Sequence, residues 1–189
     1  MAATYSWTVV IFLSLSSIIS AQTCKWLHPN QGVVTRQILQ NFQQMIPAED
    51  SPGVCLNSNF SLPDLRHLYQ ITAVQSAAIA VREVGNQTTQ FYRRYEERLD
   101  YHWPAWERLQ ELLYYQEQQL SDCIPEGAEN QLFIQGISQQ FTTLQRILEE
   151  QEDEVCARRT AHAEIRRNLL LAGQLLSRMR RQRLQRHLF

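Results

Sequence analysis

The sequence predicts an all-α protein, a bundle of five main helices with a long connection after the first one. Three observations support this fold class. Glycine and proline occur only six times each among 189 residues. Apolar residues recur at spacings of three and four over long stretches, whereas strand-like alternation is rare. The stretch 47–61 is rich in Pro, Ser, Asn and Gly, as expected for a loop.

The N-terminus has the pattern of a secretory signal peptide. Residues 1–21 carry no charged side chain and include an apolar core, Val9 to Leu15, before small residues that end at Ala21. The basic residues that usually open a signal peptide are missing. Polar residues interrupt the apolar run, so it does not reach the roughly 20 residues of a membrane anchor. We expect cleavage after Ala21, one secreted domain at 22–189, and no membrane insertion.

The first helix is expected over 34–46, because four apolar residues share one side there and Pro47 ends the pattern. These residues are Val34, Ile38, Phe42 and Met45. The loop 47–61 contains Cys55, and loops of this length in compact domains are usually functional or tethered. A second helix is expected from Ser61 as its N-cap, with Pro63 in its first turn. Its inward stripe comprises Ile71, Val74, Ala78, Val81, Gly85 and Tyr92.

Two further helices are predicted in the middle of the chain. Pro104 opens the third, whose inward residues are Trp106, Leu109, Leu113 and Leu120. The fourth has the stripe Ile134, Ile137, Phe141, Leu144 and Leu148. The acidic run 149–154 is interpreted as a solvated turn, because acids at a helix C-terminus oppose the helix dipole. The aromatic cluster Trp103, Trp106, Tyr114 and Tyr115 is interpreted as core and boundary packing.

The fifth helix begins near Cys156 and has two contrasting sides. Its core side comprises Ala161, Ile165, Leu169, Ala172, Leu176 and Met179. The opposite side comprises Arg159, Ala163, Arg166, Arg167, Leu170 and Gln174. Arginine and apolar anchors are over-represented at protein interfaces, so this side is a candidate docking surface. The alternative is an ordinary solvated outer face of a bundle helix.

No catalytic or metal-binding constellation is evident. The five histidines lie far apart, and there is no His-Glu-x-x-His, phosphate-binding glycine loop or Gly-x-Ser-x-Gly motif. His162 is interpreted as a helix-surface or boundary residue. The net charge of −1 argues against a general nucleic-acid binder. We therefore expect no enzyme, no cofactor, no metal and no nucleic-acid partner.

Cysteines and glycosylation motifs agree with secretion. Four cysteines in a secreted chain imply two disulfides, for which spacing alone permits three pairings. Asn59 and Asn86 each begin an Asn-x-Ser/Thr motif and are candidate glycosylation sites. Asn86 falls away from the predicted core stripe, so we expect it to be modified more readily than Asn59.

The start of the fifth helix resembles a known family. Cys156-Ala157, then Ala163-Glu164-Ile165 and Arg166-Arg167, is similar to the Cys-Ala-Trp-x-x-Val-Arg-Ala-Glu-Ile motif in the last helix of type I interferons. Arg158 replaces the tryptophan, and Ala161-His162 stands where Val-Arg is usual. Element order and cysteine placement resemble the family over the mature chain, and the chain is identified as a divergent, four-cysteine, non-mammalian member. The resemblance implies a helical cytokine bundle.

The resemblance also implies function and site residues. It implies an antiviral cytokine that bridges two class II cytokine receptor chains on the cell surface and triggers JAK–STAT signalling. It implies the disulfides Cys24–Cys123 and Cys55–Cys156. One receptor chain would bind the long loop and the last helix, through Leu56, Ala163, Arg166 and Arg167. The spacing that defines the outer side of the fifth helix adds Arg159 and Leu170 to the candidate receptor-binding residues. The second would bind the middle helices on the opposite face.

Two alternatives to this interpretation stay open. The first is another helical cytokine, such as an interleukin-like or type III interferon-like ligand. The second is a secreted protein that binds heparin or a membrane through the basic tail from Arg178 to Arg186.

Overall fold

The computed structural model describes residues 30–47, 62–124 and 132–186. These residues form five α-helices and one 3-10 helix, with no strand among them. In chain order the elements are α2 (Gln31–Met45), η3 (Leu65–Gln70), α3 (Val74–Arg94), α4 (Trp103–Ser121), α5 (Leu132–Glu150) and α6 (Glu154–Arg186). The predicted all-α fold is confirmed for the described residues.

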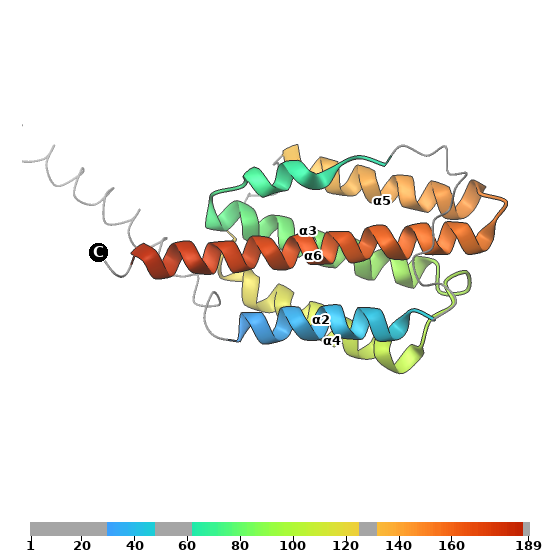
Figure 1. The fold of residues 1–189 in the computed structure, drawn as a ribbon, viewed down its shortest axis with the longest axis horizontal. Coiled ribbons are helices and arrows are strands. Elements are labelled where there is room, and N and C mark those ends of the chain that lie inside the picture. The colour runs from blue at the N-terminus through green and yellow to red at the C-terminus, as the bar shows by residue number, and fades with distance from the viewer. Residues whose placement is uncertain (1–29, 48–61, 125–131, 187–189) are drawn as a thin grey trace, which may run out of the picture.

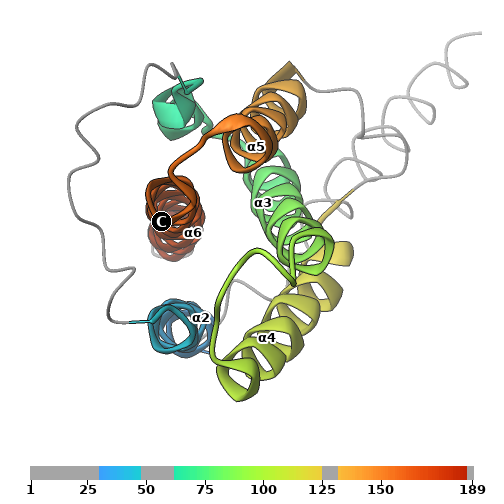
Figure 2. The same cartoon turned by 90° about the vertical axis from the view of Figure 1, so that its right-hand side faces the viewer.

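The helices lie side by side in one bundle (Figure 1). α2, α3 and α5 run in one direction, and α4 and α6 run in the other. Because α2 and α3 are parallel, the chain between them has to cross the length of the bundle, as in bundles with long crossover connections. Seen end-on, α6 lies between α2 on one side and η3 with α5 on the other (Figure 2).

The second helix differs from its prediction, because the chain from Pro63 to Arg94 is not one helix. Asp64 caps the short 3-10 helix η3 by accepting a hydrogen bond from the Arg66 amide. The backbone is then extended at Ile71 and at Ala73 before α3 begins at Val74. The predicted N-cap, Ser61, lies outside the described residues. Of the predicted stripe, Ala78, Val81 and Tyr92 are buried, whereas Ile71, Val74 and Gly85 are only partly buried.

The core follows the predicted stripes of the other helices. The four stripe residues of α2 and the six of α6 are all buried, as are Trp106, Leu109, Leu113 and Leu120 of α4. In α5 the stripe is buried from Ile137 onward, while Ile134 is partly buried. At Gly173 the helices α6 and α2 approach closely, since a Cβ atom there would lie 2.5 Å from the Thr35 Cγ2 atom. A side chain larger than glycine at this position would push the two helices apart.

His162 is not at the surface, and its predicted position is wrong. Only 1% of this residue is exposed, and its Nδ1 atom lies 2.5 Å from the Tyr92 hydroxyl oxygen. The two rings also stack, with centroids 5.8 Å apart. The reason is that α6 packs against α2, α3 and α5 at once. A helix with three neighbours buries a wider face than a single apolar stripe suggests.

Of the predicted aromatic cluster near α4, only Trp106 is buried in the core. Trp103, Tyr114 and Tyr115 are exposed, so the predicted core and boundary packing is wrong for these three residues. At about 100° per residue, Tyr115 projects from the side of α4 opposite Trp106. Trp103 lies at the first turn of the helix and stacks on Tyr101, with ring centroids 6.3 Å apart.

The acidic run spans the junction of α5 and α6, since Glu149 and Glu150 end α5 and Glu154 begins α6. The turn itself, residues 151–153, is shorter than the predicted 149–154. Within it, Asp153 caps α6, because its Oδ1 atom accepts a hydrogen bond from the Cys156 amide at 3.0 Å. A carboxylate at this position also interacts favourably with the helix dipole. Glu149 accepts a hydrogen bond from the Tyr95 hydroxyl at 2.5 Å, which ties the turn to the end of α3. The start of the candidate docking helix is therefore well defined.

Cys123 and Cys156 are both disulfide-bonded. Cys24 and Cys55 lie outside the described residues, so the pairing of the four cysteines stays a prediction. The predicted signal peptide, residues 1–21, also lies outside them. Among the described residues, no helix has the length and apolar character needed to cross a membrane.

Candidate functional site

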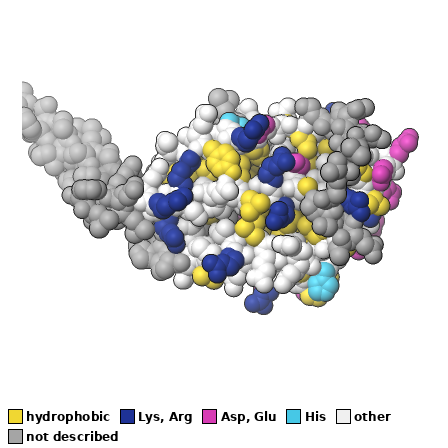
Figure 3. Space-filling model, in the orientation of Figure 1, with side chains coloured by type: hydrophobic (Ala, Val, Ile, Leu, Met, Phe, Trp, Pro, Cys, Tyr) yellow, Lys and Arg dark blue, Asp and Glu magenta, His cyan; other side chains and the backbone are white. Residues whose placement is uncertain are grey.

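The candidate site is the outer face of α6, defined here by Arg159, Ala163, Arg166, Arg167, Leu170 and Gln174. Arg166, Arg167 and Gln174 are exposed, and the other three are half-buried. The structure thus brings five of the six predicted contact residues together on one face. The sixth, Leu56, lies outside the described residues. Basic side chains are spread over this side of the molecule, and acidic ones gather at the end where α6 begins (Figure 3).

Glu164 holds the Arg167 side chain on the outer face. The Arg167 guanidinium lies 3.0 Å from the Glu164 carboxylate, one turn earlier in the helix. Glu164 is buried, and this burial is the main reason that its pKa is raised. The neighbouring Arg167 charge acts in the opposite direction, and Asp64 adds to the rise. The Arg167 side chain itself is 73% exposed, so its remaining donors are available to a partner.

The start of η3 extends the site beyond α6. The Asp64 carboxylate accepts hydrogen bonds from the backbone amide and the guanidinium of Arg66, at 2.9 and 2.6 Å. The backbone bond is the main cause that lowers the pKa of Asp64, and the charge of Arg167 also contributes. Asp64, Glu164 and Arg167 therefore influence one another electrostatically across the border between η3 and α6. The start of η3, a few residues after the long loop, therefore lies near the outer face.

A buried polar chain joins the same elements beneath the surface. The Asn168 side-chain amide donates to the Gln140 side-chain oxygen at 2.7 Å. The Gln140 amide in turn donates to the Pro63 carbonyl at 3.1 Å. Both amide side chains are buried, and a buried polar group left without its partner costs about 1–3 kcal/mol. This chain fixes the residues just after the long loop against α5 and α6.

The C-terminal half of α6 is also tied to η3. The Tyr69 hydroxyl donates a hydrogen bond to the Gln174 side-chain oxygen. The Arg178 guanidinium donates to the backbone carbonyls of Tyr69 and Ile71. Arg178, the first residue of the basic tail, is therefore engaged in the fold.

Sequence reasoning missed η3 and its contacts with α6. One signal could have found η3, since Leu65, Leu68 and Ile71 recur every three residues, which is the period of a 3-10 helix. No local signal indicates the bonds of Arg178, because their acceptors are main-chain carbonyls more than 100 residues earlier.

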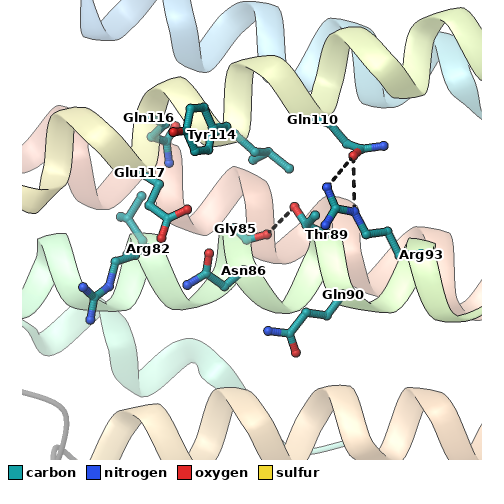
Figure 4. A pocket seen from close by; sticks show the side chains of 12 residues that line it. Arg82, Gly85, Asn86, Thr89, Gln90, Arg93, Gln110, Tyr114, Gln116 and Glu117 are labelled. Atoms are coloured by element: carbon teal, nitrogen blue, oxygen red, sulfur yellow. Dashed lines mark hydrogen bonds between the residues drawn. The ribbon is translucent and has the colours of Figure 1, made fainter.

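A groove separate from the α6 outer face lies between α3 and α4 (Figure 4). This groove has a volume of about 220 Å³ and is lined mostly by polar residues, among them Arg82, Asn86, Gln110 and Glu117. Asn86 is half-buried at its wall. The other candidate glycosylation site, Asn59, lies outside the described residues. In the part of the chain that is described, no three metal-binding side chains converge.

A comparison with models of known protein families identifies the family of this chain. The family model of the interferon alpha/beta domain matches residues 27–179. The chain belongs to this family. The match includes η3 and every residue of the α6 outer face. No curated protein and no solved structure matches the chain. Members of this family are cytokines rather than enzymes.

Proposed function

We propose that the chain is a secreted antiviral cytokine that binds and bridges two class II cytokine receptor chains, and so triggers JAK–STAT signalling. Family membership supports the cytokine role. The observation that carries the proposal is the exposed row of Arg166 and Arg167 beside half-buried Leu170 on α6. Interfaces are anchored by a few arginine and apolar residues of this kind, within a rim of weaker polar contacts.

The first receptor chain would bind the outer face of α6 together with the long loop that precedes η3. Arg166 and Arg167 would supply charged donors, and Ala163 and Leu170 the apolar centre. The loop would contribute Leu56, and the proposed disulfide Cys55–Cys156 would tie it to the start of α6. Ordering both parts in advance lowers the entropic cost of association.

The second receptor chain would bind the opposite side of the bundle, where α3 and α4 lie (Figure 2). Two receptor chains on opposite faces can be bound at once, because neither covers the surface that the other uses. Their cytoplasmic kinases would then be brought together. The protein performs no reaction in this mechanism, and its action follows from binding geometry alone.

Purified mature protein added to receptor-bearing cells tests the proposal. We expect phosphorylation of the receptor-linked transcription factors in these cells. Replacing Arg166 and Arg167 by alanine should abolish most of that response. An intact response from this double variant would show that the outer face of α6 does not bind the receptor.

The two alternatives are separated by further measurements. Another type of helical cytokine would signal through a different receptor pair, which cells expressing defined pairs can identify. A heparin- or membrane-binding function of the basic tail would be lost when the residues after Met179 are deleted. We expect receptor signalling to survive that deletion, because buried Met179, Arg178 and its bonds to η3 are retained.

A further inference from the structure

The groove between α3 and α4 contains the acceptor of a glycosylation motif. Asn86 of α3 lines one wall of the groove. Gln110, Tyr114 and Glu117 of α4 line the facing wall (Figure 4). At about 220 Å³, the groove holds only part of an oligosaccharide. A sugar chain on Asn86 would therefore begin in the groove and leave it toward solvent.

The three residues of the motif point in different directions in the folded chain. Asn86 lines the groove, whereas the Gln87 side chain donates to Glu83 at 2.8 Å and lies 3.4 Å from Ser138 of α5. Thr88 is fully buried, and its hydroxyl donates to the Val84 carbonyl at 2.7 Å. The transferase has to read the asparagine and the threonine hydroxyl together. Because Thr88 is inaccessible in α3, the modification has to precede the folding of this helix.

The composition of the groove fits a saccharide. Sugar rings carry hydroxyl groups at their edges and C–H groups on their faces. Gln110, Arg93 and Glu117 provide donors and acceptors for the hydroxyl groups. Tyr114, 64% exposed on the rim, provides an aromatic face on which the C–H side of a ring can pack.

We propose that Asn86 carries an N-linked glycan, attached before α3 folds, whose first sugars lie in the α3–α4 groove against Tyr114. In the transfer, the Asn86 amide nitrogen loses a proton and bonds to the anomeric carbon of an oligosaccharide. The bond from that carbon to the pyrophosphate of a lipid carrier breaks, and the lipid pyrophosphate leaves. The inference rests on the secretory route in the proposed function and does not depend on receptor binding. Because α3 and α4 also form the side proposed for the second receptor chain, that chain would contact this side outside the groove.

Mass spectrometry of the secreted chain tests the attachment. An Asn59→Gln background leaves Asn86 as the only asparagine in such a motif. We expect the peptide with Asn86 to carry hexosamine, and enzymatic removal of the glycan to convert this asparagine to an aspartate. A chain that is secreted with unmodified Asn86 would overturn this inference and leave the cytokine proposal standing. A chain that is not secreted would instead contradict the proposed secretory route itself.

The order of events is tested with unglycosylated chain made in bacteria. The oligosaccharide transferase and its lipid-linked donor should modify Asn86 in the reduced, unfolded chain and not in the refolded one. Equal modification of both forms would show that Thr88 is accessible after folding, against the proposal.

The position of the sugars is tested by tyrosine footprinting, with two adjacent tyrosines as probe and control. Tyr114 lines the groove, and exposed Tyr115 does not. We expect Tyr114 to be labelled severalfold more in the Asn86→Gln variant than in the glycosylated protein, and Tyr115 equally in both. Enzymatic removal of the glycan from folded protein gives a second comparison if the variant fails to fold. Equal labelling of Tyr114 with and without the glycan would place the sugars outside the groove.

Discussion

Arg178 of α6 closes the C-terminal end of η3 by donating hydrogen bonds to the backbone carbonyls of Tyr69 and Ile71. These carbonyls belong to the last turn of a short 3-10 helix and to the residue after it, where the helix itself supplies no donor. Tyr69 in turn is bonded to Gln174 on the outer face of α6. One arginine therefore links the C-terminal half of α6 to the segment that follows the long loop.

We predict that Arg178→Ala lowers the free energy of unfolding by about 1.5–3 kcal/mol, the range for hydrogen bonds to charged groups. Thermal unfolding with Arg181→Ala as the control measures this, since Arg181 is exposed on the same helix. If the two variants are equally stable, the bonds of Arg178 contribute nothing to the fold.

The helices and their inward stripes could be predicted from the sequence, because apolar residues at a period near 3.6 are a local signal. The two sides of α6 were predicted for the same reason. η3 was missed because a spacing of three also occurs on the apolar face of an α-helix, and the segment was expected to be α-helical. His162 was predicted at the helix surface or boundary because nothing near it in the sequence indicates a buried partner. That partner, Tyr92, lies 70 residues earlier in the chain. The bonds of Arg178 likewise depend on how the segments pack.

The core side of α6 gives a prediction that concerns stability alone. Ile165 is fully buried between the helices. Ile165→Ala should lower the free energy of unfolding by about 2–5 kcal/mol, because it removes buried methylene groups and leaves a cavity. Chemical denaturation measures the loss. A loss of less than about 0.5 kcal/mol, the range of ordinary surface substitutions, would contradict the position of Ile165 in the core.

The disulfide pairing implied by the interferon resemblance can be tested directly. We expect Cys24–Cys123 and Cys55–Cys156, and each bond would close a loop of about 100 residues, worth up to roughly 4.7 kcal/mol in the loop-entropy model. Non-reducing peptide mapping identifies the pairs. A peptide that joins Cys24 to Cys55 would exclude this pairing.

The outer face of α6 gives a prediction that separates binding from stability. Arg166→Ala with Arg167→Ala should weaken binding to the isolated first receptor chain by roughly 1–3 kcal/mol, about ten- to a hundredfold. Arg166→Ala should change the free energy of unfolding by no more than about 0.5 kcal/mol, because the residue is exposed. Arg167→Ala also removes the ion pair with Glu164 and should cost up to about 1 kcal/mol.

The matched control for this pair is Arg93→Ala with Arg94→Ala, which removes two adjacent exposed arginines from α3, outside the proposed site of the first receptor chain. We expect this control to bind the first receptor chain as tightly as the unaltered protein does. Unchanged affinity in the Arg166 and Arg167 variant would show that the face is ordinary solvated surface.

Glu164 makes the stability of the fold depend on pH in a direction that can be worked out. Burial raises its pKa in the folded protein above the ordinary value for glutamate. Between these two values, the folded state binds more protons than the unfolded state, so the free energy of unfolding falls as pH rises. The contribution of this group is therefore complete below the ordinary pKa and is lost as pH rises through the raised one. Glutamine at position 164 cannot titrate.

The free energy of unfolding of the Glu164→Gln variant, relative to that of the unaltered protein, should therefore be higher at neutral pH than in mildly acidic solution. Glu111→Gln, at an exposed position, is the control. The loss of the ion pair with Arg167 works against this gain at neutral pH, where the carboxylate is charged. Because the Arg167 side of that pair is largely exposed to solvent, the ion pair contributes little to stability. We therefore expect the cost of burying the charged Glu164 carboxylate to be the larger effect. Denaturation at both pH values measures the difference. A variant that loses stability relative to the unaltered protein as pH rises would mean that the ion pair outweighs burial.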